Sequence, residues 1–212
     1  MTTPFSGRLR CGSSTDMRTL DITQDSVESS LRLPSTDFGL PAEAAEARRT
    51  IAKLRQRAAQ VREIHTFRTG MGLAAPQIGI HRRAAIIYLA EQDDVITLLN
   101  PRIQEQSTAV ETRFEGCLSF FDVRGQVARP VHLLIAHQRL DGTQVTSAFE
   151  GSVARLVAHE IDHLNGVLYT QRMAAGDRPI PVEHYRRTAY EVTTADASGS
   201  RGTTPGSVGS SR

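Results

Sequence analysis

The sequence lacks three features that would assign it to a broad class of protein. No apolar run approaches the roughly 18 residues of a transmembrane helix, and the N-terminus has no continuous apolar segment typical of a secretory signal. Lys+Arg 25 nearly balances Asp+Glu 23, so neither nucleic acid nor a membrane is predicted as a partner. Two cysteines, Cys11 and Cys117, provide no disulfide framework. We therefore expect a cytoplasmic location.

Both ends of the chain also lack hydrophobic periodicity. Ser, Thr and Asp cluster in the first 35 residues, and the last 20 are rich in Gly, Ser and Thr. These compositions predict a flexible N-terminal arm at 1–37, a folded domain at 38–192 and a disordered C-terminal tail at 193–212. Within the arm, residues 31–34 are the part expected to touch the domain.

The middle of the chain predicts an α+β fold with a mainly antiparallel sheet. Apolar residues recur every three or four positions from 44 to 65, which is typical of an amphipathic helix packed on a core. Asp141-Gly142 lies between two strand candidates and predicts a hairpin turn. The strand candidates are residues 83–90, 95–99, 101–106, 109–114, 131–139, 143–149 and 167–169, and a terminal helix is expected at 181–192.

The segment 151–166, GSVARLVAHEIDHLNG, predicts a helix that carries a metal site. His159 and His163 are four residues apart, which places both imidazoles on one helix face. Glu160 follows the first histidine and can reach a water on the same ion, and Gly166 is suited to end the helix. The alternative is a chance match, since the pattern is loose. The segment alone does not name the remaining ligands.

Two further segments could complete such a site. Residues 70–79, GMGLAAPQIG, form a tight loop or an active-site wall, and the sequence leaves both interpretations open. Cys117 could be a small buried hydrophobic residue, which is the commoner role of an unpaired cysteine. Together with two histidines on a helix, it is also a candidate thiolate ligand. A Cys-His-His set leaves a fourth position for water, as catalytic sites do.

Three motifs in this order resemble those of the peptide deformylase family. They are GMGLAAPQ at 70–77, EGCLS at 115–119 and HEIDH at 159–163, and their joint occurrence is specific. The resemblance covers roughly residues 40–175. It implies antiparallel sheets wrapped around the H-E-x-x-H helix, with the catalytic domain at 38–192. It also implies that the chain is a metal-dependent hydrolase that removes the formyl group from N-formyl-methionyl peptides of new proteins, releasing formate.

The resemblance also implies a role for particular residues. Cys117, His159 and His163 would hold one divalent ion, Fe(II) in the cell, with Zn, Ni or Co as substitutes. A water on that ion would attack the formyl carbon, with Glu160 as base and then acid. Gln77 and the Leu118 N–H would stabilise the developing oxyanion, and Glu115 and Arg129 would pair behind the ligands. The residues expected at the substrate are Gly70, Met71, Gly72, Gly116, Arg124 and Arg155. The expected partners are formylated peptide N-termini, including nascent chains at the ribosome, and we expect a monomer.

Several positions depart from the family pattern. Ala158 replaces a usual Gln, and the early D-P-x-L-R element is not recognisable. Arg113, Ser152 and Arg155 stand where the family has an apolar methionine pocket. One interpretation is that the arginines point outward and leave the pocket ordinary. The alternative is a specialised deformylase or amidase for a different formylated substrate, including an acidic one.

Two other classes of protein stay open on the sequence alone. A catalytically silent, deformylase-like binding protein would fit the altered pocket. A zincin-type peptidase would use the same histidine motif, with Glu183 as its third ligand, twenty residues after His163.

Overall fold

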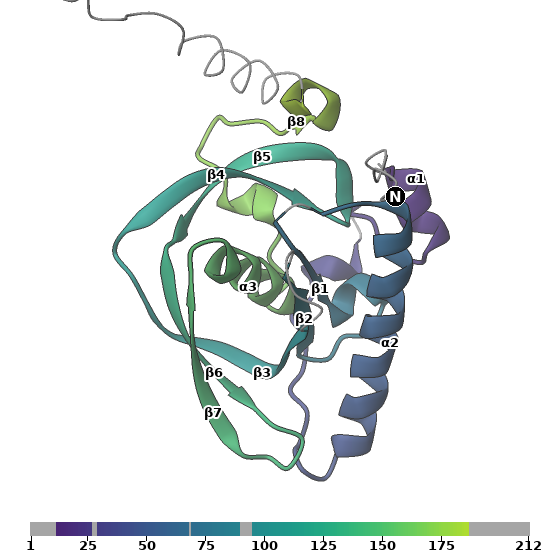
Figure 1. Cartoon of the computed structure of the whole chain (residues 1–212), viewed down its shortest axis with the longest axis vertical. Coiled ribbons are helices and arrows are strands. Elements are labelled where there is room, and N and C mark those ends of the chain that lie inside the picture. The colour runs from purple at the N-terminus through teal and green to yellow at the C-terminus, as the bar shows by residue number, and fades with distance from the viewer. Residues whose placement is uncertain (1–11, 27–28, 68, 90–94, 187–212) are drawn as a thin grey trace, which may run out of the picture.

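The computed structural model describes residues 12–26, 29–67, 69–89 and 95–186. Two antiparallel sheets surround one helix (Figure 1). The strands are β1 (Met71–Ala74), β2 (Ala84–Tyr88), β3 (Val95–Gln106), β4 (Val110–Cys117), β5 (Phe120–Pro130), β6 (His132–Gln138), β7 (Gln144–Glu150) and β8 (Ile180–Pro181). The helices are α1 (Ser14–Thr19), α2 (Ala44–Ile64) and α3 (Gly151–Leu164), with 3-10 turns η1 (Ser30–Arg32), η2 (Ala75–Ile78) and η3 (Tyr169–Arg172). The predicted α+β class is confirmed.

Helix α3 lies at the centre of this arrangement. The five-stranded sheet has the order β1-β2-β3-β6-β7, and the three-stranded sheet has the order β4-β5-β8. In Figure 1 the strands curve around α3, with β4 and β5 above it and β6 and β7 to one side. Helix α3 contacts both sheets, so side chains on different faces of the helix meet different strands.

The two faces of β2 separate two apolar clusters, as strand alternation requires. Ile86 packs toward α2 with Leu54 and Val61, whereas Ile87 packs toward α3 with Val157 and Ile161. All six side chains are at most 2% exposed. The sheet therefore fixes the distance between α2, which is scaffold, and α3, which carries the predicted metal motif.

The hairpin at Asp141-Gly142 is confirmed, because β6 and β7 pair antiparallel around it and Gly142 has φ +85. The strands expected at 95–99 and 101–106 are one strand, β3, with an irregularity in its pairing after Leu99. Asn100 has φ 49 there, a conformation that Asn tolerates better than most residues. A single residue thus bends the strand instead of ending it.

The second half of the domain differs from the prediction in two elements. The strand expected at 167–169 is wrong, because Tyr169 begins the 3-10 turn η3 instead. Strand β5 was not predicted, since Asp122, Arg124 and Gly125 interrupt its apolar pattern. Residues 182–186 are helical, and the rest of the helix expected at 181–192 lies outside the described residues, as does the tail at 193–212.

The N-terminal segment, expected to be a flexible arm, is packed where the structure describes it. Met17 and Leu31 are 0% exposed and Ile22 is 2% exposed, and Met17 and Ile22 join the cluster that α2 covers. Ser35 N–H donates to the Leu164 carbonyl at the end of α3. Burial of these three separated residues depends on contacts with distant segments, which a local pattern does not reveal.

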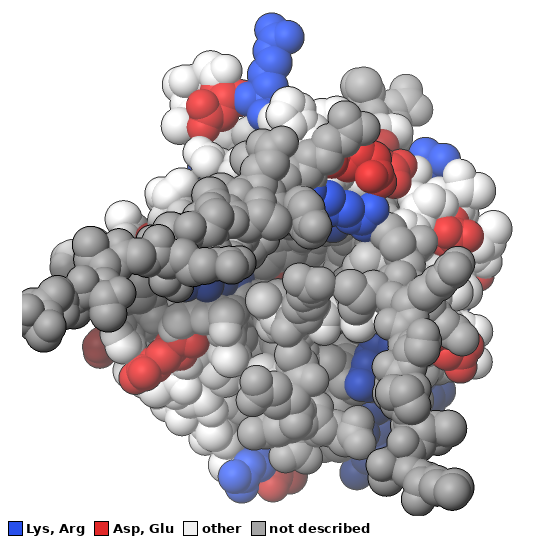
Figure 2. Space-filling view, turned by 45° about the horizontal axis from the view of Figure 1, so that its top comes forward, with Lys and Arg blue, Asp and Glu red and all other residues white. Residues whose placement is uncertain are grey.

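Among the described residues that are visible in Figure 2, acidic and basic side chains lie interspersed. Among the described residues, no helix is long and apolar enough to cross a membrane.

Because Leu31 is fully buried, we expect Leu31→Ala to lower the free energy of unfolding by about 2–5 kcal/mol. Leu33→Ala is the matched control, since Leu33 is 57% exposed and lies two residues later. Urea unfolding of both variants measures the difference. Equal stability of the two variants would contradict the packed position of this segment.

Candidate metal centre and active site

Helix α3 presents both histidines of the HEIDH motif toward the interior. His159 is 7% exposed and His163 is 1% exposed, and their ring centroids lie 5.0 Å apart. Helix α3 ends at Leu164 with Asn165 as its C-cap, and Gly166 has φ +73. A Cβ on Gly166 would lie 2.6 Å from the Arg32 carbonyl oxygen, so both conformation and space require glycine there.

Strand β4 brings Cys117 to the same place. Cys117 Sγ lies 3.2 Å from His163 Nε2, and the ligand atoms of Cys117, His159 and His163 all lie within 4.8 Å of one another. The end of β4 therefore places Cys117 next to a residue that follows it by 46 positions in the chain. Among the described residues, these three side chains form the group that could hold one metal ion.

The Glu115 carboxylate orients the first histidine. Glu115 Oε2 lies 3.0 Å from His159 Nδ1, and Arg129 donates to both carboxylate oxygens, each at 3.0 Å. Burial alone would raise the pKa of Glu115, but hydrogen bonds from His159 and Arg129 hold it well below its usual value. With Nδ1 held in this way, His159 turns its Nε2 toward the other ligands.

Glu160 stands beside the cluster with a carboxylate oxygen, Oε2, that is buried and has no hydrogen-bond partner. Burial raises the pKa of Glu160 to about 7. A Cβ on Gly72 would lie 2.2 Å from Glu160 Oε1, so this glycine of β1 makes the space that the carboxylate occupies. A buried carboxylate without a partner suits proton transfer to and from a bound molecule.

The Gln77 amide is oriented by its own backbone neighbours. Its Oε1 accepts a hydrogen bond from the Ala74 N–H at 2.9 Å, which leaves Nε2 facing Cys117 Sγ at 3.5 Å and Ser119 Oγ at 3.3 Å. Gln77 is 1% exposed. The amide donor is therefore fixed at the edge of the cluster.

One cavity of about 590 Å³ joins these groups. Arg124 lines it, hydrogen-bonded to the backbone carbonyls of Phe121 and Val123, and burial lowers its pKa below the usual value. A Cβ on Gly116 would lie 2.5 Å from Arg124 Cζ. The predicted site residues on its wall are Gly70, Met71, Gly72, Gln77, Glu115, Gly116, Cys117, Leu118, Arg124, Arg155, His159 and Glu160. Predicted residues that do not line it are His163 and Arg129.

The donor set fits a divalent transition metal. A cysteine sulfur and two imidazoles are the ligands that suit Zn(II) and iron, and a three-ligand set leaves room for a water. The described structure also has unpartnered buried atoms around the cluster, Glu160 Oε2, His163 Nδ1 and Tyr169 Oη. Cys117, His159 and His163 are thus able to bind a metal.

Sequence reasoning missed a third buried carboxylate in this centre, beside Glu115 and Glu160. Asp162 accepts hydrogen bonds from Arg129 at 2.5 Å and from Arg172 at 2.7 Å. Tyr169 stacks on the His159 ring with centroids 6.0 Å apart. Asp162 lies inside the HEIDH motif, so its position next to His163 was the available signal, whereas nothing local marks Tyr169.

The residues that depart from the family pattern fall into three environments. Ala158 is 4% exposed and packs in the apolar cluster between α3 and the sheet. Arg113 is 52% exposed and pairs with Glu111. Arg155 does not point outward, since its side chain is only 12% exposed and reaches Glu115. The cavity wall that contains Arg155 is therefore not an ordinary apolar pocket.

Comparisons with known proteins agree with this geometry. The family model of polypeptide deformylase matches residues 21–179. A peptide deformylase of Agrobacterium fabrum is 37% identical over 123 residues, which are 57% of this chain and 72% of that protein. Peptide deformylase 1 of Bacillus subtilis is 43% identical over 105 residues, but the match covers 50% of this chain and 65% of that protein.

Solved structures show the same likeness. A peptide deformylase of Synechococcus elongatus in complex with actinonin has TM-score 0.63 and 30% identity, covering 73% of this chain and 79% of that one. A class I type b peptide deformylase from Acinetobacter baumannii has TM-score 0.61 and 28% identity, covering 71% and 96%. The fold and the buried Cys-His-His cluster define an α+β protein that can hold one metal ion beside a cavity. The chain belongs to the polypeptide deformylase family.

The metal content of two variants distinguishes Cys117 from Glu183 as the third metal ligand. Glu183 has a 71% exposed side chain and pairs with Arg186, and it lies outside the cluster. We expect Cys117→Ala to purify with far less than one metal ion per chain, whereas Glu183→Ala keeps the full content. Inductively coupled plasma mass spectrometry measures both. Metal loss in Glu183→Ala alone would favour a zincin-type site.

Proposed function

We propose that this protein hydrolyses the formyl amide at the N-terminus of formylated peptides and releases formate. The observation that carries the proposal is the position of Glu160. Its partnerless buried carboxylate shares one cavity with Cys117, His159 and Gln77, while His163 completes the ligand set behind them. The neighbouring structure from Acinetobacter baumannii is described as bound to Met-Ala-Ser, which supports a peptide in this cavity.

The proposed residue roles follow from what each group can donate or accept. An ion held by Cys117, His159 and His163 would lower the pKa of a bound water toward neutrality and so supply the nucleophile. Glu160 takes a proton from the attacking water as the new C–O bond forms. As the C–N bond breaks, Glu160 returns the proton to the leaving amine. Formate and a free peptide N-terminus are the products.

Negative charge develops on the formyl oxygen during this step. Gln77 Nε2, fixed by the bond from Ala74 N–H to Oε1, is positioned as one donor, and the Leu118 N–H is proposed as the second. Gln24 Nε2 donates to the Leu118 carbonyl at 3.0 Å, and Thr23 N–H donates to the Gln77 carbonyl at 2.8 Å. The N-terminal segment thus contacts the backbone of both donor residues.

We propose Fe(II) as the ion in the cell and the cytoplasm as the location. A cysteine ligand supports a reducing compartment, because oxidation of the thiolate would remove it from the ligand set. Imidazole and thiolate ligands also accept Zn, Ni and Co, so the activity should follow the ion that is loaded. Nascent chains at the ribosome are the proposed source of substrate, and a monomer is the proposed state.

A catalytically silent binding protein is the second candidate, motivated by the altered cavity wall at Arg113 and Arg155. Glu160, Gln77 and the three ligands are all present and converge, and a protein that only binds would not require them together. Formate release by anaerobically purified protein of known metal content distinguishes the two candidates.

Loss of the proton acceptor should abolish turnover without loss of the metal. We expect Glu160→Gln to keep its metal content and to lower kcat by about 100- to 10,000-fold, because general acid–base catalysis contributes roughly that factor. Glutamine keeps the shape of the side chain, so the cavity is preserved. Formate release and metal content measured on the same sample provide the check, and near-normal kcat would refute the assigned role.

We expect a side chain at position 72 to impair turnover, because Gly72 leaves the space that the Glu160 carboxylate occupies. A methyl group at this position would overlap Glu160 Oε1, so Gly72→Ala should displace the carboxylate and lower kcat by about 100-fold or more. Gly39→Ala is the control, since a Cβ there meets its nearest atom at 3.7 Å. A Gly72→Ala enzyme as active as Gly39→Ala would disprove the proposed position of Glu160.

A further inference from the structure

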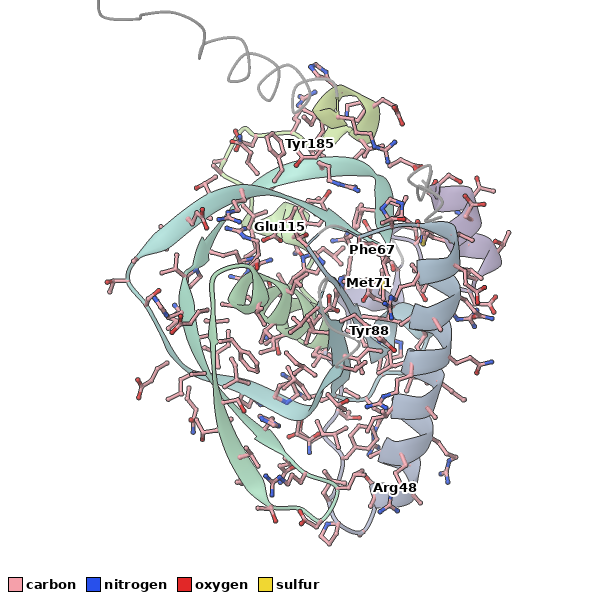
Figure 3. All side chains as sticks on the ribbon, in the orientation of Figure 1. Arg48, Phe67, Met71, Tyr88, Glu115 and Tyr185 are labelled. Atoms are coloured by element: carbon pink, nitrogen blue, oxygen red, sulfur yellow. The ribbon has the colours of Figure 1, made fainter. Side chains whose placement is uncertain are left out.

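One wall of the cavity has a chemistry that the hydrolysis of a formyl group does not use. Arg155 and Ser152 of α3 line it together with Arg113 of β4. Met71, from β1, lines the cavity as well, and Figure 3 labels it with Glu115 of β4. The three polar side chains include two guanidinium groups, whereas no step proposed above needs a cation at this wall.

Arg155 is fixed in this wall by its own contacts. Its Nη1 donates to Glu115 Oε1 at 2.7 Å and to the Val127 carbonyl at 2.9 Å, and its Nη2 donates to the Glu111 carbonyl. A guanidinium has five N–H groups. The described residues accept three of them, so two donors of a side chain that lines the cavity are left for a ligand.

In the part of the chain that the structure describes, Arg155 has no carboxylate of its own behind the wall. Arg155 and Arg129 share the Glu115 carboxylate, and Arg129 also pairs with Asp162, together with Arg172, which is 49% exposed. Among these groups Arg155 and Glu115 are the ones that line the cavity. A substrate carboxylate placed here would accept charge-assisted hydrogen bonds from Arg155 in a partly desolvated position, where such bonds are strongest.

The first side chain of a bound peptide can reach this wall. Arg155 precedes His159 by one helical turn on the same face of α3, a separation of about 6 Å between Cβ atoms. A formyl group beside His159 and Glu160 puts the α-carbon of the first residue next to that turn. A side chain of two or three carbons that ends in a carboxylate then meets the free donors of Arg155.

An apolar side chain at the same place would be a poor fit. A thioether or an alkyl group would cover the two free N–H groups of Arg155 and would separate them from water. A buried charged donor without an acceptor is unfavourable, and more so than the loss of a neutral hydrogen bond.

We propose that Arg155, assisted by Ser152, selects formylated peptides whose first residue is acidic, aspartate or glutamate, over those that begin with methionine. The proposal rests on the deformylase activity proposed above, and it replaces nascent chains that begin with formyl-methionine by another formylated peptide as the preferred substrate. Arg155 touches the substrate side chain and not the reacting atoms, so it determines specificity and does not take part in the chemistry.

The test compares kcat/KM for formyl-Glu-Ala-Ser, formyl-Gln-Ala-Ser and formyl-Met-Ala-Ser with the metal-loaded full chain. We expect the Glu peptide to exceed the Met peptide by about 10-fold or more, which is the range of one charge-assisted hydrogen bond. The Gln peptide should fall between them, because it keeps the acceptor and loses the charge. A preference for the Met peptide would overturn the proposal while leaving the deformylase activity established.

Three variants show whether Arg155 causes the preference. Arg155→Leu should lose the preference for Glu or reverse it, and Arg155→Lys should keep part of it by keeping the charge. Arg172→Leu is the matched control, since it removes a guanidinium from the same ion-pair network at a residue that does not line the cavity. An Arg155→Leu enzyme with the same Glu-to-Met ratio as Arg172→Leu would also overturn the proposal.

A binding measurement separates this proposal from the proposed function. Calorimetry with the unformylated peptides Glu-Ala-Ser and Met-Ala-Ser needs no turnover. Tighter binding of Glu-Ala-Ser by about 10-fold, lost in Arg155→Leu, supports the specificity even where formate release fails for every peptide, a result that would refute the deformylase activity alone. Equal binding of the two peptides, or tighter binding of Met-Ala-Ser, would refute the specificity.

Discussion

The Glu115 carboxylate is the group on which the geometry of the metal centre depends. It accepts hydrogen bonds from His159, Arg129 and Arg155 while almost fully removed from water. A buried charge is tolerated only when its partners are fixed, and loss of one partner typically costs about 3–5 kcal/mol. Because the partners come from β5 and α3 and the carboxylate from β4, this ion-pair network also fixes the smaller sheet against the central helix.

The same network joins the ligands to the cavity wall. Glu115 holds His159 through Nδ1 and holds Arg155 through its other oxygen, Oε1. The residue that orients a metal ligand is therefore also the residue that turns Arg155 inward. Substrate preference and metal geometry depend on one carboxylate, which explains how an arginine is accommodated next to a catalytic cluster without pointing into solvent.

Space is the second constraint at the site. Gly72 and Gly116 are glycines because a Cβ at either position would overlap a functional side chain, Glu160 in one case and Arg124 in the other. The motifs thus contain residues with functional side chains and glycines that leave space for those side chains. The N-terminal segment adds a third part, since its backbone and Gln24 contact the residues proposed to stabilise the oxyanion.

Features that depend on local spacing could be predicted from the amino-acid sequence alone. His159, Glu160 and His163 follow helical periodicity, and Asp141-Gly142 specifies a hairpin, so both could be predicted without a structure. The residues alone left Cys117 as either a buried hydrophobic residue or a thiolate ligand, because no local rule joins residues 42 positions apart. The resemblance of the three motifs to the family assigned it as the partner of the histidines.

Features that depend on contacts between distant segments follow from the packing of the whole domain. Strand β5 forms because β4 pairs with it, despite a sequence broken by charge and glycine. Met17, Ile22 and Leu31 are buried because the domain offers them a surface, although the local composition predicts a flexible arm. Arg155 could point outward or inward by its position on the helix, and the buried Glu115 carboxylate on a neighbouring strand determines that it points inward.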